Sequence, residues 1–289
     1  MSGAQAALLP DGRLHLHHGP IDLVIMAEEQ SEEARRIAYR AARDRFATVL
    51  NELVPELPLL RRTLGVRPKG KIAGRMHRAC AAVAQGDFIT PMAAVAGSVA
   101  DEVLAAMLAA TPLARAYVNN GGDIALHLAA GQTFRAAIAG LGGQISGQIT
   151  LAAEDGIGGI ATSGQGGRSL SRGIATSVTV LAAGAAQADA AATLVANAVD
   201  LPDHPAISRQ PAQELHPDSD LGARLVVTHV GALSQSDIAS ALSRGVLRAQ
   251  SLVDAGHVAA AALLLQGQGA TTHHRSWASA LSERSLQHA

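Results

Sequence analysis

Short apolar runs separated by glycine-rich turns fill residues 114–182, and this pattern constrains the fold more than any other feature of the chain. Runs of this length between such turns are typical of β-strands. We therefore expect strands at 114–119, 123–129, 133–139, 145–152, 157–162 and 176–182. Because helical segments interrupt and flank these runs, the sequence predicts an α+β (mixed α/β) single domain.

The flanking segments complete this prediction. Ser31 is placed to cap a long helix that Pro55 ends, and Thr90-Pro91 opens a second helix reaching about Ala110. Further strands are expected at 13–17, 21–27, 224–229 and 257–265, and further helices at 185–199 and 234–254. The domain is predicted to span residues 1–266, followed by a flexible tail at 267–289 that is rich in Ser, His and Arg.

Composition excludes several classes of function. The chain has 289 residues, a net charge of −1 and only 2% aromatic residues, which argues against a nucleic-acid partner. Cys80 is the only cysteine, so neither an internal disulfide nor a thiolate-rich metal site can form. No signal peptide is visible, and Asp101 and Glu102 interrupt the apolar stretch at 93–110. The expectation is a cytoplasmic protein without a membrane partner.

One turn carries an unusual group of polar residues. Asn119, Asn120, Gly121, Gly122 and Asp123 separate two of the apolar runs. Glycines at such a turn allow positive φ, and consecutive exposed N–H groups there can form a concave site for phosphate. A plain hairpin built on Asn-Gly explains the same residues, and on this segment alone it is the favoured interpretation.

Two further segments combine small and polar residues. Thr162, Ser163 and Gly164 can donate hydrogen bonds to a ligand or simply form a turn. Asp189 and Thr193 lie four residues apart, so they share one face of the helix expected there. A carboxylate and a hydroxyl are hard oxygen ligands that Mg²⁺ accepts alongside phosphates, although Asp189 can also simply stabilise the first helical turn.

A basic segment precedes these motifs. It holds Arg61, Arg62, Arg67, Lys69, Lys71, Arg75 and Arg78, with no acidic residue between them. Its spacing superficially matches a P-loop, but Ile72 stands where the Mg²⁺-binding Ser or Thr belongs, so a P-loop is rejected. The segment could clamp an anionic ligand, although a solvated charged surface is the more frequent outcome.

Taken together, these motifs resemble a known family. Asn120-Gly-Gly-Asp123, Ala161-Thr-Ser-Gly164 and Ala188-Asp-Ala-Ala-Ala-Thr193 occur in the order found in the ApbE-type FAD:protein FMN transferases. The segment from Ala94 to Asp101 is similar to that family's helix of small residues ending in aspartate. The residues at 18–22, 90–97 and 117–124 resemble those of an uncharacterised cytoplasmic branch of this superfamily.

The resemblance implies a fold and a site. The fold is an ApbE-like single large domain with a mainly antiparallel sheet core and flanking helices. Asn119–Asp123 and Thr162–Gly164 would line a cleft for FAD or a related nucleotide, and Asp189 with Thr193 would hold Mg²⁺. The chain departs from the family at Arg168–Ser177, where the family's His-x-Ile-Ile-Asp-Pro-x-Thr-Gly signature is absent, and at Ala96, which replaces a lysine. Without that histidine, no catalytic residue is assigned as the general base.

Two functional interpretations follow from the resemblance. One is a divergent Mg²⁺-dependent enzyme that transfers FMN or cleaves the pyrophosphate of FAD. The other is a non-catalytic accessory protein that binds a flavin or nucleotide for a partner oxidoreductase. The sequence leaves open a homo-oligomeric state, but a purely structural oligomer would give the glycine-amide turn no role.

Overall fold

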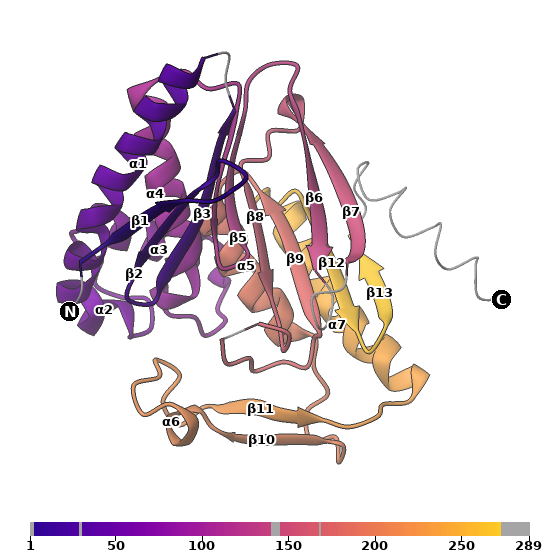
Figure 1. The fold of residues 1–289 in the computed structure, drawn as a ribbon. Helices are drawn as coiled ribbons and strands as arrows, with labels where there is room; N and C mark the ends of the chain where they lie inside the picture. The colour runs from indigo at the N-terminus through magenta and orange to yellow at the C-terminus, as the bar shows by residue number, and fades with distance from the viewer. Residues whose placement is uncertain (1–2, 29–30, 140–144, 168, 273–289) are drawn as a thin grey trace. The chain divides into compact units, whose positions relative to one another are not determined.

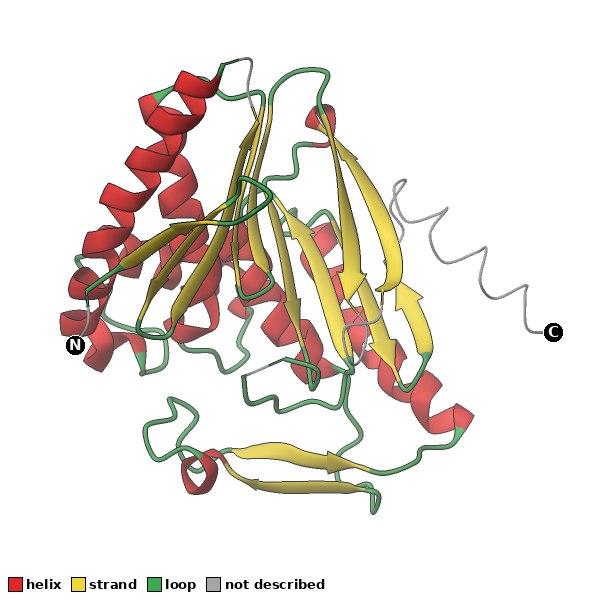
Figure 2. Ribbon diagram, viewed as in Figure 1, coloured by secondary structure: helices red, strands yellow, loops and turns green. Residues whose placement is uncertain are grey.

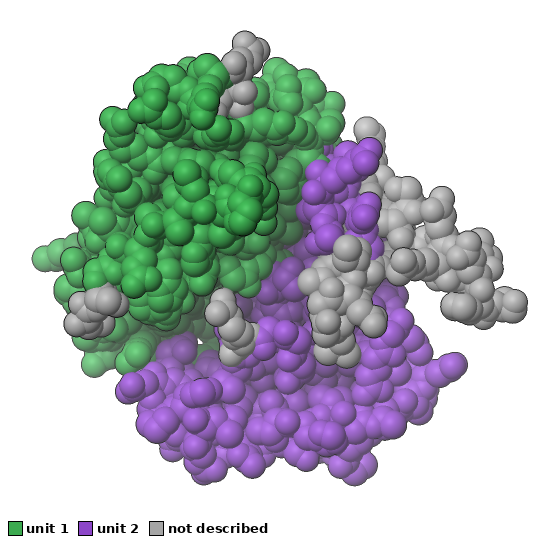
Figure 3. Space-filling view, viewed as in Figure 1, with its two compact units in different colours: residues 1–134, 152–161, 182–190 green, residues 135–151, 162–181, 191–289 purple. Residues whose placement is uncertain are grey.

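The computed structural model describes residues 3–28, 31–139, 145–167 and 169–272. The chain divides into two compact units, coloured green and purple in Figure 3. Unit 1 comprises residues 1–134, 152–161 and 182–190, and unit 2 comprises 135–151, 162–181 and 191–289.

An antiparallel sheet organises unit 1. Its strands follow the order β1 (Gln5–Leu8), β2 (Leu14–His18), β3 (Ile21–Glu28), β4 (Arg115–Asn120), β5 (Asp123–Leu128) and the first part of β8 (Gly159–Ser163). Leu16 pairs with Leu23, and Ile25 pairs with Val118. All four of these side chains are fully buried, because alternate residues along each strand point to the same face and build the core there.

Helices cover this buried face of the unit 1 sheet. They are α1 (Glu32–Leu53), η1 (Val54–Glu56), α2 (Leu57–Leu60), α3 (Lys71–Ala84), η2 (Pro91–Ala94) and α4 (Val95–Ala110), drawn in red in Figure 2. Ser31 caps α1 as expected, because its hydroxyl accepts a hydrogen bond from Ala34 N at 3.2 Å. Helix α1 packs on β2 and β3, and α4 packs on β4 and β5 (Figure 1).

Asp101 and Glu102 do not interrupt the apolar stretch as expected, because the helical segment Pro91–Ala110 continues through both of them. Its 20 residues are long and apolar enough to cross a membrane by length and composition alone. Half of the segment is nevertheless buried inside the protein, and Glu102 at its centre lies among three basic side chains. These features are those of a core helix.

Unit 2 contains a second set of antiparallel strands. β12 (Ala260–Leu265) pairs with both β9 (Ser177–Ala182) and β13 (Gln268–Thr271), and α7 (Gln235–Asp254) packs on β12 and β13. A separate pair is formed by β10 (Ile207–Pro211) and β11 (Leu225–Val230), next to the short α6 (Ala212–Leu215). β6 (Thr133–Ala139) pairs with β7 (Ile145–Ala152), which η4 (Ala153–Asp155) follows. Helix α5 (Ala185–Ala198) begins in unit 1 and continues in unit 2.

The predicted fold class is confirmed: the protein is α+β, with mainly antiparallel pairing and flanking helices. Several elements were not expected from the sequence, notably α3 within the basic segment and β10 within a polar connection. Residues 268–271 were predicted to belong to the C-terminal tail. They instead form β13, because their backbone pairs with that of β12 in an antiparallel arrangement. The remainder of the predicted tail, 273–289, lies outside the described residues.

Candidate functional site

The Asn119–Asp123 segment is a tight hairpin turn. Asn120 pairs with Asp123, which leaves Gly121 and Gly122 as a loop of two residues with φ of 65° and 115°. Positive φ at both central positions is the geometry of a type I′ turn, which favours glycine. Gly122 N donates to Asn119 Oδ1 at 2.9 Å, so one amide of the expected phosphate site is already engaged. The hairpin interpretation therefore describes the local structure.

The side chain of Asn120 ties this turn to the start of α4. It is only 8% exposed, and its Nδ2 donates to Ala96 O at 3.1 Å. A buried amide that finds a backbone acceptor fixes the position of both segments. Two motifs separated by more than twenty residues in the sequence are thus in direct contact.

Asp189 contacts the same turn of α4 through its carboxylate. Its Oδ2 accepts a hydrogen bond from Gly97 N at 3.0 Å. Burial raises the pKa of Asp189 well above its usual range, and repulsion from Asp123 raises it further, while the amides of Gly97 and Ala96 act in the opposite direction. The turn, the start of α4 and Asp189 therefore form one cluster within unit 1, the Asp189 cluster.

Asp101 is a structural member of this region to which the sequence analysis gave no role. Its two oxygens accept from Ala185 N at 2.9 Å and Ala186 N at 3.0 Å, which caps the start of α5. Burial raises the pKa of Asp101, against the effect of these two amides. Because α5 carries Asp189, this cap fixes where Asp189 lies. The pairing could not be read from spacing, since Asp101 and Ala185 lie 84 residues apart.

Gly97 sets how closely α4 and α5 approach. A Cβ at this position would lie 2.2 Å from Ala185 O and 2.7 Å from Ala186 N, far inside any normal contact. Only glycine therefore allows the two backbones to meet and its own amide to reach Asp189.

Thr193, the second predicted metal ligand, lies one turn after Asp189 in α5 and is partly exposed. Among the residues that the structure describes, no group of three or more His, Cys, Asp or Glu side chains is arranged to hold a metal ion. Mg²⁺ commonly takes only one or two carboxylates when phosphates supply the remaining oxygens, so a site built on Asp189 and Thr193 would be of that kind.

The second group of predicted nucleotide ligands lies in unit 2. Thr162 Oγ1 shares a hydrogen bond with Thr179 Oγ1 at 3.0 Å, and Ser163 ends β8. Gly164 has φ of 129°, and a Cβ there would lie 2.9 Å from Ala175 O. This segment is therefore a constrained turn at the end of a strand, as its glycine suggested.

The segment that replaces the family's histidine signature is held firmly at Arg172. Arg172 N donates to Asn197 Oδ1 at 3.0 Å, and Arg209 Nη1 donates to Arg172 O at 2.8 Å. Arg209 in turn pairs with Asp200 at 2.6 Å. Arg168 lies outside the described residues.

A surface hollow elsewhere in unit 1 has a volume of about 550 Å³. It is lined by residues 108–113 and His127, at the end of α4 and on β5. None of the predicted site residues lines it, and His127 already bonds to Leu113 O at 3.1 Å.

Comparisons with known proteins agree with the motifs. A family model described as "AbpE bacteria" matches residues 6–271. No curated protein matches the sequence.

Among solved structures, the ApbE protein from Thermotoga maritima is 15% identical with a TM-score of 0.47, covering 80% of this chain and 98% of that one. The apo flavinyl transferase ApbE from Pseudomonas stutzeri is 13% identical with a TM-score of 0.48, covering 95% and 94%. The flavin transferase ApbE from Vibrio cholerae is 13% identical with a TM-score of 0.40, covering 95% and 98%. With every TM-score below 0.5, these likenesses assign neither residues nor activity. The family model does identify the chain: because it matches residues 6–271, the protein belongs to the ApbE-like family described as AbpE bacteria.

Proposed function

We propose that this protein binds FAD or a related nucleotide together with Mg²⁺, and that Asp189 and Thr193 are the metal ligands. The observation that carries the proposal is the Asp189 cluster. Three motifs far apart in the sequence, Asn120–Asp123, the start of α4 and Asp189, meet within unit 1. A merely structural role for Asp189 does not require a second carboxylate beside it.

The chemistry of the cluster fits a divalent cation. Burial and the negative charge of Asp123 both disfavour the ionised form of Asp189, which raises its pKa. A bound cation would compensate both effects. Thr193, one helical turn further along α5, would add a neutral oxygen ligand. When bound between phosphates, Mg²⁺ neutralises charge that develops on the leaving group.

The polar turns would hold the nucleotide. Gly121 and Gly122 bring backbone close to a ligand without side-chain obstruction, and a Cβ at Gly122 would meet nothing within 4 Å. The role of the chain's own residues is to position the phosphates, since phosphoryl-type chemistry depends mainly on positioning and electrostatics.

The protein that binds FAD could be an enzyme or a non-catalytic carrier, and residues 168–177 bear on which of the two it is. The Asp189 cluster supports a Mg²⁺-dependent enzyme that transfers FMN or cleaves the pyrophosphate. Residues 168–177 contain no histidine to act as general base for an acceptor hydroxyl. This second observation favours a non-catalytic carrier that serves a partner oxidoreductase, so turnover must be measured separately from binding.

The test is a titration with FAD in the presence and absence of Mg²⁺, followed by separation of FAD, FMN and AMP. Asp189→Asn keeps the size of the side chain and one acceptor oxygen but removes the charge. We expect Mg²⁺ to tighten FAD binding to the original protein at least about tenfold, a change of roughly 1.4 kcal/mol, and to have no such effect on the variant.

Asp44→Asn is the matched control, because Asp44 is an exposed carboxylate of α1 that pairs with the neighbouring Arg43 at the surface. It should retain the full effect of Mg²⁺. Appearance of FMN and AMP would establish the enzyme, and tight binding of intact FAD would establish the carrier. Equal FAD binding with and without Mg²⁺ in the original protein would refute the metal site.

A further inference from the structure

The basic segment found in the sequence becomes a defined surface in unit 1. Its exposed cations include Arg62, Arg67 and Lys69 on the loop that also carries the exposed Val66, which is 77% accessible, and Arg78 on α3. None of these four cations forms an ion pair with another described residue. We call these five residues the basic surface.

The loop that carries this surface is fixed in place. Gly65 O bonds to His77 Nε2 of α3 at 3.3 Å, and the buried Pro68 lies against the same helix beside Gly74. Arg78 follows Gly74 by one helical turn on that face. The backbone that carries these cations is therefore ordered before any partner binds, which lowers the entropy cost of association.

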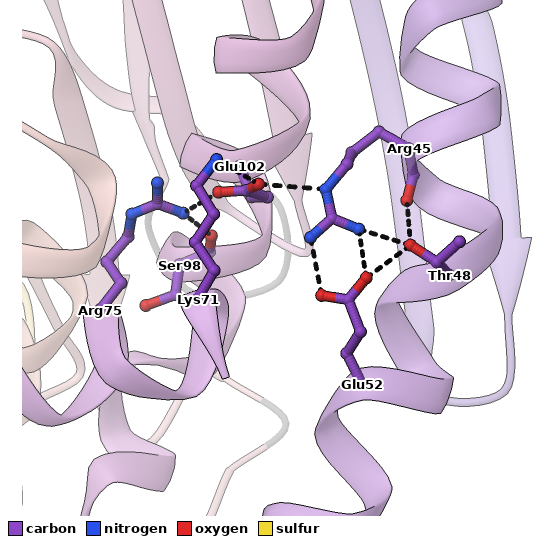
Figure 4. Close-up of polar contacts among 7 residues, drawn as sticks. All are labelled: Arg45, Thr48, Glu52, Lys71, Arg75, Ser98 and Glu102. Carbon is purple, nitrogen blue, oxygen red and sulfur yellow. Dashed lines mark hydrogen bonds and ion pairs between the residues drawn. The ribbon is translucent and has the colours of Figure 1, made fainter. Parts of the chain in front are cut away.

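Neighbouring basic residues are already neutralised, which sets the basic surface apart from them. Figure 4 shows Lys71, Arg75 and Arg45 directed at the buried Glu102. Their nitrogens lie 2.8, 2.8 and 3.0 Å from its carboxylate oxygens. Burial disfavours the charged form of Glu102, but these three bonds outweigh it and hold its pKa below the usual value. This cluster around the buried Glu102 links α3 to α1 and α4.

The geometry also excludes a compact phosphate at the start of α3. The amides of Lys69 and Gly70 both donate to Glu56 Oε1, at 2.9 and 2.7 Å, so a carboxylate of the protein itself occupies that position. What remains for a ligand is a set of exposed side-chain cations together with the exposed Val66. Arginine pairs especially well with planar carboxylates, and apolar residues ringed by charge are typical of protein interfaces.

From this arrangement we propose that the basic surface is a docking site for an acidic segment of another protein. A membrane is disfavoured because Val66 is a single small anchor, and stable membrane attachment needs more than one such signal. Single-stranded nucleic acid is disfavoured because residues 61–78 contain no Phe, Tyr or Trp side chain on which a base could stack. The proposal stands apart from the flavin site, since docking requires neither FAD nor metal.

The test is binding of a fluorescent polyglutamate peptide, measured by anisotropy, with polyglutamine of equal length as the neutral probe. We expect polyglutamate alone to bind, and more weakly as salt rises. The double variant Arg67→Glu/Lys69→Glu should weaken binding by roughly tenfold or more, because it reverses two of the four charges of the basic surface. The pair Arg67→Gln/Lys69→Gln gives a smaller loss in the same direction and serves if the first variant does not fold.

The control variant Arg36→Glu/Arg43→Glu makes the same change of charge on the exposed part of α1. It should alter the affinity by less than about twofold if the site is local rather than a general effect of net charge. Equal weakening by both double variants would overturn the proposal. So would equal binding of the two peptides, or binding of phosphatidylserine vesicles or single-stranded DNA that polyglutamate fails to displace.

The composition of the chain provides a second measurement. Lys69 and Lys71 are its only lysines, so acetylation of lysine reports on this region alone. Bound polyglutamate should slow acetylation of Lys69 by several-fold, roughly in proportion to occupancy. An unchanged rate at saturating peptide would place the binding elsewhere and refute the assignment.

Discussion

Asp189 is the residue at which stability and proposed function conflict. Its carboxylate is held by backbone amides, yet burial and Asp123 oppose its ionisation. Groups kept in an unfavourable state by their surroundings are concentrated at functional sites. Burial also raises the pKa of Asp101, but both of its oxygens are used to cap α5.

Asp189→Asn should stabilise the metal-free protein at neutral pH, because it removes a charge that the folded state disfavours. We expect a rise in unfolding temperature of roughly 2–4 °C. Thermal unfolding with and without Mg²⁺ checks this. Mg²⁺ should stabilise the original protein and leave the variant unchanged, whereas a variant less stable than the original in metal-free buffer would contradict the argument.

The same carboxylate predicts a pH dependence. The unfolded chain loses the Asp189 proton near its ordinary pKa of about 3.9, whereas the folded protein keeps the proton until its raised pKa. Stability from this group therefore falls as pH rises through that window. Glu102 acts oppositely: its lowered folded pKa gives stability above about pH 4.3 that is lost as pH falls further. Above about pH 4.3, where the contribution of Glu102 is constant, urea unfolding up to neutral pH should show a flatter profile for Asp189→Asn, and parallel profiles would refute this prediction.

At the scale of elements, the contact between α4 and α5 depends on one glycine. Gly97→Ala would place a methyl group 2.2 Å from Ala185 O, so the helices must separate and the bond from Gly97 N to Asp189 must lengthen. We expect a loss of stability of about 2 kcal/mol or more, of the size seen for overpacked cores. Chemical denaturation measures it.

Gly74→Ala in α3 is the matched control for this substitution. A Cβ there would make only ordinary contacts, the nearest at 3.5 Å to Arg78 Nη1. Because alanine favours helix, this variant should gain roughly 0.5–1 kcal/mol. Similar effects of the two alanines would show that helix propensity, and not the approach of α4 to α5, governs position 97.

Elements were predicted well where a local signal existed. The hairpin β4–β5 follows from its glycine turn, and α1 follows from its Ser31 cap and apolar spacing. Helix α3 was missed because its basic residues hid the apolar face formed by Ile72, Met76 and Val83. β13 was missed because four polar and small residues gain strand structure only from pairing with β12.

For the whole molecule, the C-terminal limit of the fold is testable by truncation. A chain ending at Thr272 keeps β13 and the bond from Ala261 N to Thr272 Oγ1, at 2.9 Å, whereas a chain ending at Gln266 loses both. We expect the first to unfold at the temperature of the full chain and the second at least about 5 °C lower. Calorimetry of the three chains checks this, and equal stability of the two truncated chains would contradict it.

The sequence by itself determined the family, the fold class and most strands and helices of this protein, because hydrophobic period, caps and turn residues act over a few neighbouring positions. It also placed Asp189 on a helix and Asn120 next to a glycine turn. Only the tertiary structure joined them through Ala96 and Gly97, with Asp189 reaching an amide 92 residues away. Such contacts depend on how every intervening element packs, and with them come the burial and neighbouring charge that set the pKa of Asp189. The same contrast applies to the basic surface. Its charge was evident in the sequence, but the fixed position of its backbone depends on Glu56, Glu102 and the packing of α3.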